Sequence, residues 1–147
     1  MLRDQIADDM RAAMKAREQT RVSTLRMLMA AVKNTEVERG EQLSDEEVVE
    51  VVAREAKRRK ESIEAYQQAG RTDLVDKETA ELAVLQPYMP EQLSDADLAR
   101  LVDEAIAEAG ATEAKQMGAV MKVLMPKVKG RADGSAVSAA VRARLGP

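Results

Sequence analysis

The stretch LQPYMPEQLSD, residues 85–95, divides the sequence into two helical parts. A residue that precedes proline is pushed out of the α region, so Pro87 and Pro90 predict that a helix ends here. The Leu-Ser-Asp triplet that follows is typical of a helix start, with Ser94 as the N-cap. We therefore place a domain boundary within this stretch. The predicted domains are residues 1–90 and 91–147.

Apolar residues recur at helical spacing throughout the first of these domains. The third predicted helix has the clearest start, because Ser44 and Glu47 can form a capping box while Leu43 packs on Val48 as a hydrophobic staple. The predicted helices span about residues 2–17, 20–39, 44–70 and 72–86, with Thr20 and Thr72 as N-caps of the second and fourth. This pattern predicts a four-helix domain.

Three further helices are predicted after the boundary. The motif EQLSD of residues 41–45 returns at residues 91–95, but the sequences that follow diverge, which indicates one helix-start signal used twice rather than a duplication. Pro126 removes a hydrogen bond to the Lys122 carbonyl, so we expect it to kink or end its helix. The predicted helices span about residues 94–110, 112–126 and 134–145. The expected fold class is all-α, an N-terminal four-helix domain followed by a C-terminal three-helix module.

Histidine and cysteine are absent from the chain, as are the glycine motifs of nucleotide-binding loops. These absences exclude Ser/His and Cys/His nucleophile pairs and the usual zinc ligands, so we expect no catalytic residue, metal or cofactor. The longest uncharged apolar run, Met27–Val32, is far shorter than the ~20 residues of a membrane span. With no cysteine for disulfides, the composition favours a cytoplasmic protein without a membrane segment.

Charge is spread unevenly along the chain. Residues 1–110 hold 16 Lys and Arg against 24 Asp and Glu, a net charge of −8, whereas residues 111–147 hold 7 against 2, a net charge of +5. This asymmetry predicts two surfaces with different partners.

Glu78 is expected to be a buried carboxylate, because Leu74 and Leu82 place it on the apolar stripe of its helix. An isolated buried carboxylate costs several kcal/mol, so a cation should pair with it, and Arg26 and Arg59 are the candidates. Glu78 and Glu81 could instead form an acid/base pair, but the structural ion pair is the favoured interpretation.

The charge run REAKRRK, residues 54–60, allows a nucleic-acid patch or a solvated helix face. Acidic and basic residues lie four apart along it, at Glu50 and Arg54 and again at Glu55 and Arg59. Such neighbours contribute a few tenths of a kcal/mol per pair, so we favour a salt-bridged face.

The basic stretch MPKVKGRADG, residues 125–134, allows two interpretations. Amides at the start of the last helix, with Lys127, Lys129 and Arg131 just before it, could bind a phosphate. Alternatively, Gly130 makes a turn and Asp133 is the N-cap of the last helix. The local pattern alone favours the turn.

Four ordered segments resemble the GatB/YqeY family across essentially the whole chain: ESIEAYQQAGRTDLVDKETAEL, LQPYMPEQLSDADL, QMGAVMKVLM and KGRADGSAVSAAVRARL. The C-terminal module is similar to the tail domain of the GatB component of the tRNA-dependent amidotransferase. The tail pattern falls on Gly118, Val120, Met121, Lys122, Gly130, Ala132, Asp133 and Val141. The resemblance implies a module that faces RNA. The implied phosphate contacts are Lys122, Lys127, Lys129 and Arg131.

Three functions follow as hypotheses. The first is a module that associates with tRNA or another structured RNA, non-catalytic by itself, whose N-terminal domain docks a protein. The second, implied by the resemblance, is an amidotransferase-like or accessory protein with carbon-nitrogen ligase activity and glutamine as amido-N donor. The catalytic domain of GatB is missing from the sequence, which gives this activity no mechanism. The third is a module that binds proteins on both surfaces.

Overall fold

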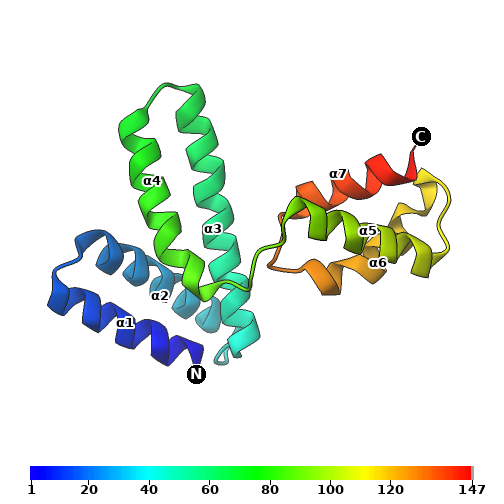
Figure 1. The fold of residues 1–147 in the computed structure, drawn as a ribbon. Helices are drawn as coiled ribbons and strands as arrows, with labels where there is room; N and C mark the ends of the chain where they lie inside the picture. Colours follow the sequence, from blue (N-terminus) through cyan, green and yellow to red (C-terminus); the bar gives the residue numbers. More distant parts are fainter. Residues whose placement is uncertain (147) are drawn as a thin grey trace. The chain divides into compact units, whose positions relative to one another are not determined.

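The computed structural model describes residues 1–146, and the described chain is all-α, as predicted (Figure 1). Its α-helices are α1 (Leu2–Ala16), α2 (Gln19–Arg39), α3 (Asp45–Gln68), α4 (Thr72–Leu85), α5 (Asp95–Ala109), α6 (Met117–Val128) and α7 (Gly134–Leu145). Two short 3-10 helices, Gln86–Tyr88 and Ala114–Gln116, follow α4 and precede α6. The chain forms two compact units, Met1–Met89 and a second that begins at Pro90. None of the described helices is long and apolar enough to cross a membrane.

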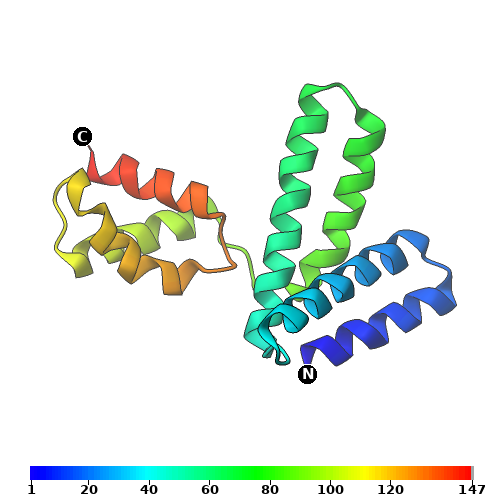
Figure 2. The same ribbon diagram turned by 180° about the vertical axis from the view of Figure 1, so that it is seen from behind.

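In the first unit, α1 pairs with α2 and α3 pairs with α4 as two antiparallel hairpins (Figures 1 and 2). Helix α2 also packs against α3 and α4, so the two hairpins share one core. The buried apolar residues of this core are Ile6, Leu25, Leu28, Val32, Leu43, Val48, Val51, Val52, Ala56, Leu85 and Tyr88.

The capping box at the start of α3 is confirmed. The Ser44 hydroxyl accepts from the Glu47 amide at 3.2 Å, and the Glu47 carboxylate accepts from the Ser44 amide at 3.1 Å. The predicted threonine caps are wrong, because α2 follows Glu18 and α4 follows Arg71, neither with a side-chain cap. The N-cap of α2 lies two residues earlier than predicted, at Glu18 instead of Thr20, and Thr72 is itself the first residue of α4.

The predicted helix end before Pro87 is confirmed, but the local geometry at the prolines differs from the prediction. Helix α4 ends at Leu85, but Gln86 stays in the right-handed helical region, with φ −54° and ψ −41°, although Pro87 follows it. Proline is tolerated in the first turn of a helix, where its missing N–H has no partner to lose, and a 3-10 turn therefore continues to Tyr88. Pro126 does not end α6, which continues to Val128.

Glu36 is a buried carboxylate that the sequence pattern did not indicate. Arg3 of α1 donates to it through two nitrogens, at 2.6 and 2.7 Å, and the Leu43 amide donates at 2.9 Å. The Leu43 hydrogen bond and then Arg3 hold the pKa of Glu36 below its usual 4.5. Its contribution to stability is complete above pH 4.5 and is lost as the pH falls through the lowered pKa. Glu36 thus joins α1, α2 and the loop before α3.

A hydrogen bond of Tyr88 connects the end of the first unit to the first hairpin. The ring of Tyr88 is buried, and its hydroxyl donates to the Asp9 carboxylate at 2.6 Å. Burial, and after it the charge and hydrogen bond of Asp9, raise the pKa of Tyr88 from 10.0 to about 12. The folded state therefore prefers the neutral phenol.

We expect this preference to appear as a loss of stability at high pH. The contribution of Tyr88 is complete below pH 10 and disappears as the pH rises toward about 12, because the unfolded phenol ionises first. In a Tyr66→Phe variant, which leaves Tyr88 as the single tyrosine, tyrosinate absorbance should rise with a midpoint near 12. A midpoint near 10 in the folded protein would contradict the assignment, and Asp9→Asn should move the midpoint downward.

The second unit is a three-helix module in which α5, α6 and α7 pack against one another. Ser94 caps α5 as predicted, its hydroxyl accepting from the Asp97 amide at 3.1 Å. Helix α6 begins at Met117 rather than near Thr112, because a 3-10 turn precedes it. The buried apolar residues of this core are Leu98, Val102, Ala105, Ala111, Val120, Leu124, Val128, Val137, Val141 and Leu145.

Candidate nucleic-acid interface

The predicted site lies at the α6–α7 turn, which we define as residues 129–133. Gly130 is left-handed with φ +75°, a conformation that side chains disfavour, and it reverses the chain. The amides of Arg131 and Ala132 both donate to the Val128 carbonyl, at 2.8 and 3.2 Å. The turn is thus closed by its own backbone directly after the helix.

A second set of hydrogen bonds holds the turn to the first residues of the unit. The Leu93 amide donates to the Arg131 carbonyl at 2.9 Å, and Arg131 Nε donates to the Glu91 carbonyl at 3.1 Å. The Gln92 side chain donates to the Pro90 and Gly130 carbonyls, each at 2.9 Å. Arg131 therefore has a structural role in addition to the one predicted. No local pattern indicated the bonds to the turn, since their partners lie about 40 residues apart.

The three candidate lysines are exposed but do not form one cluster. Lys122 and Lys129 lie seven residues apart along α6 and its C-cap, which places them on one face, whereas Lys127 is turned well away from Lys122. The Lys127 ammonium pairs with the Glu108 carboxylate of α5 at 3.2 Å. The structure thus places Lys129 and Arg131 in the turn, Lys127 near the end of α6, and Lys122 further along the helix.

The basic segment, residues 111–147, does not make up the whole of the second unit. The second unit also contains the acidic helix α5, so residues 90–147 hold 8 Lys and Arg and 8 Asp and Glu. Two cations of the segment pair with α5, Lys127 with Glu108 at 3.2 Å and Arg144 with Asp103 at 3.1 Å. These four side chains are exposed, and such pairs typically contribute only about 0–1 kcal/mol. A polyanion could therefore displace the carboxylates at little cost.

The remaining residues of the tail pattern have structural positions. Asp133 is at the N-cap of α7, as predicted, but its side chain makes no cap hydrogen bond and accepts from the Ser135 hydroxyl instead. Gly118 lies on the exposed face of α6, where an added Cβ would meet no other atom. Within residues 1–146, no group of acidic side chains is arranged to hold a metal ion.

The buried carboxylate of α4 is Glu81, not Glu78. Glu81 is 8% exposed and its carboxylate lies 3.5 Å from Arg59 Nε, whereas Glu78 is half-buried and Arg26 is exposed. Arg59 also donates to the Glu55 carboxylate and carbonyl, both at 3.1 Å. Spacing could have found this residue, because Glu81 shares a stripe with Leu85 and Tyr88, at i, i+4 and i+7. Arg59 is one of the two cations predicted to pair with a buried carboxylate of this helix, but it pairs with Glu81 instead of Glu78.

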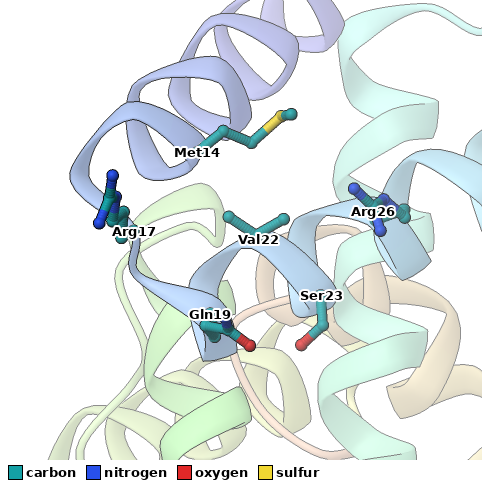
Figure 3. A pocket seen from close by; sticks show the side chains of 6 residues that line it. All are labelled: Met14, Arg17, Gln19, Val22, Ser23 and Arg26. Atoms are coloured by element: carbon teal, nitrogen blue, oxygen red, sulfur yellow. The ribbon is translucent and has the colours of Figure 1, made fainter.

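Two open pockets lie in the first unit, and the sequence indicated neither. The larger, which we call the α1–α2 pocket, has a volume of about 400 Å³ (Figure 3). It is lined by Met14, Arg17, Gln19, Val22, Ser23 and Arg26. The smaller, of about 250 Å³, lies where α3 turns into α4 and is lined by Tyr66, Gln67, Gly70, Arg71, Thr72 and Val75.

The helical architecture and the tail pattern agree with a comparison against known families. Residues 3–145 match the family described as "Yqey-like protein". The chain belongs to this family, which confirms the resemblance found in the sequence motifs. The match covers both units.

Several curated fungal proteins are similar to this chain. A protein of Pyrenophora tritici-repentis named "Altered inheritance of mitochondria protein 41, mitochondrial" is 31% identical over 142 residues, which cover 94% of this chain and 77% of that protein. A protein of the same name from Eremothecium gossypii is 34% identical over 85 residues, covering 57% of this chain and 46% of that protein. An uncharacterised protein of Schizosaccharomyces pombe is 29% identical over 83 residues, covering 56% of this chain and 68% of that protein.

These names contradict the cytoplasmic location expected from composition, because the relatives are named as mitochondrial proteins. The expectation rested on the lack of cysteine and of a membrane span. Neither feature distinguishes the cytosol from another compartment, so composition was the wrong basis for a location.

Proposed function

We propose that this protein associates with structured RNA through the α6–α7 turn of its second unit, and that it carries out no catalytic step by itself. The observation that carries the proposal is the exposure of Lys127, near the end of α6, and of Lys129, in the turn that hydrogen bonds to residues 91–93 hold in place. A fixed turn presents its cations to phosphates with little further loss of backbone conformational entropy.

The electrostatics support an interface that reads shape and phosphate positions rather than bases. Both tyrosines lie in residues 1–89, so the second unit offers no aromatic ring on which a base could stack. Its overall charge is balanced, and the Glu108 carboxylate of α5 pairs with Lys127. We therefore expect modest affinity that depends strongly on salt, with the cations around the turn displacing counterions from only a few phosphates.

A mobility-shift titration tests the proposal with full-length protein and two probes, a mitochondrial tRNA and a cytosolic tRNA, at about 50 and 200 mM salt. We expect Lys127→Ala combined with Lys129→Ala to weaken binding about tenfold at the lower salt, and to reduce the slope of log affinity against log salt by about 1.5–2. The mitochondrial probe is included because the fungal relatives are named as mitochondrial proteins.

The matched control is Lys15→Ala combined with Lys77→Ala, which removes the same charge from exposed positions of the first unit. This control should bind tRNA almost as well as the unmodified protein. The proposal fails if neither tRNA is shifted at low salt. It also fails if the control loses as much affinity as the turn variant, because binding would then depend on overall charge alone.

A further inference from the structure

The α1–α2 pocket combines positive charge with an apolar floor. Four of its residues, Gln19, Val22, Ser23 and Arg26, follow one another at i, i+3, i+4 and i+7 and so form a single stripe along α2. Met14 and Arg17, from the end of α1, complete the lining. In Figure 3, Arg17 and Arg26 lie at opposite ends of the pocket, with Met14 and Val22 between them.

Both guanidinium groups lack a partner. Across residues 1–146, no ion pair or hydrogen bond engages the side chain of Arg17 or Arg26, although the first unit holds 18 Asp and Glu. The neighbouring Arg21, by contrast, pairs with Glu18 at 3.5 Å. Met14 is 51% exposed, one of few large apolar side chains so exposed in the described chain. Two cations therefore flank an uncovered apolar patch.

Arg17 also occupies a position where local stability favours glycine. It is the C-cap of α1 with φ +58°, the left-handed region that L-residues adopt at a cost. The equivalent positions after α2 and α5 are Gly40 and Gly110. An arginine here sacrifices some stability and places a guanidinium at one end of the pocket, which agrees with a binding role.

We propose that the α1–α2 pocket binds an acidic amphipathic helix of a partner protein. An apolar side chain of that helix lies between Met14 and Val22, and two carboxylates about two helical turns apart pair with Arg17 and Arg26. Arg17 lies two residues before Gln19, from which the axis of α2 rises by about 10 Å to Arg26, and two carboxylates seven residues apart on one face of a facing helix span a similar length. This surface belongs to the first unit and is independent of the RNA interface proposed for the second.

Charge and chemistry favour a peptide over the other anions. A single phosphate or free carboxylate would meet only one of the two separated guanidiniums. An RNA would gain little from the apolar floor, and the first unit carries a net charge of −3, with 15 Lys and Arg against 18 Asp and Glu. Methionine adapts to apolar side chains of different shape, which suits a helix-binding surface.

The test is fluorescence anisotropy with full-length protein and a labelled synthetic helix that carries two glutamates seven residues apart and a leucine between them. We expect saturable binding that is weakened about tenfold or more by Arg26→Ala, by Arg17→Gly, and by replacement of the peptide leucine with serine. Arg54→Ala is the matched control, because Arg54 is an exposed arginine of the same unit outside the pocket. It should leave binding unchanged.

The Arg17→Gly variant distinguishes a loss of peptide binding from a loss of stability. Glycine relieves the left-handed strain, so this variant should have a Tm equal to or above that of the unmodified protein while it binds the peptide more weakly. The proposal is overturned if the peptide does not bind saturably, or if Arg17→Gly and Arg26→Ala both bind as tightly as Arg54→Ala. It is also overturned if a single-stranded RNA oligonucleotide binds the pocket and the peptide does not.

Discussion

Replacing Arg59 by alanine is expected to lower the free energy of unfolding of the first unit by about 3–5 kcal/mol. Arg59 is 5% exposed and lies between the buried carboxylates of Glu55, at 3.1 Å, and Glu81, at 3.5 Å. Its Nε–H makes no well-aligned hydrogen bond, so the contact with Glu81 is chiefly electrostatic. Without the guanidinium, two negative charges remain in a poorly solvated site with no cation between them. Urea unfolding followed by tyrosine fluorescence measures the loss.

Arg58→Ala is the matched control for this prediction. Arg58 is the next residue of α3 and also contacts Glu55, at 3.5 Å, but its side chain is 73% exposed. Exposed pairs typically contribute about 0–1 kcal/mol, so the control should unfold almost like the unmodified protein. Equal losses of unfolding free energy in the two variants would show that burial of the Glu55–Arg59–Glu81 triad does not determine the effect.

A second comparison separates charge from packing. Combining Arg59→Met with Glu55→Leu and Glu81→Leu removes all three charges and keeps the volume roughly filled. Buried ion pairs are often replaced by apolar residues at no cost, so this variant should recover most of the stability that Arg59→Ala loses. A triple variant as unstable as Arg59→Ala would mean that the triad stabilises the unit by itself.

The helices were largely predictable because their signals are local. The Ser44–Glu47 capping box and the Ser94 cap appear in the structure as the sequence indicated, since each depends on residues three apart. The prolines were less predictable. The conformational preference of a residue before proline is modest. At Gln86 the chain instead forms a 3-10 turn, which buries Tyr88 in the first core.

The partners of the buried polar groups could not be predicted, because they are distant in sequence. Arg3 and Glu36 are 33 residues apart, and Tyr88 and Asp9 are 79 apart. Periodicity places a residue on a face of its helix but does not say which faces meet, so it indicates Glu78, whereas Glu81 is the buried carboxylate. The candidate RNA site shows the same limit. Net charge counted along the chain did not reveal that α5 carboxylates lie beside Lys127 and Arg144.

We expect Leu124→Ala to destabilise the second unit and leave the first unit unchanged. Leu124 is fully buried in the core formed by α5, α6 and α7. Removing a buried leucine side chain costs about 2–5 kcal/mol, because apolar contacts are lost and a cavity remains. For a domain of this size that corresponds to a fall in Tm of roughly 10 °C or more.

Tyrosine fluorescence and circular dichroism distinguish the unfolding of the two units in this experiment. Both tyrosines lie in residues 1–89 and tryptophan is absent, so tyrosine fluorescence follows the first unit alone, whereas far-ultraviolet circular dichroism follows the helices of both. Leu124→Ala should lower a transition seen by circular dichroism and leave the fluorescence transition in place. Leu28→Ala, a buried leucine of the first core, should do the reverse and lower the fluorescence transition. If each variant instead moves both signals together, the two units unfold as one cooperative domain, and the predicted division between residues 90 and 91 has no thermodynamic meaning.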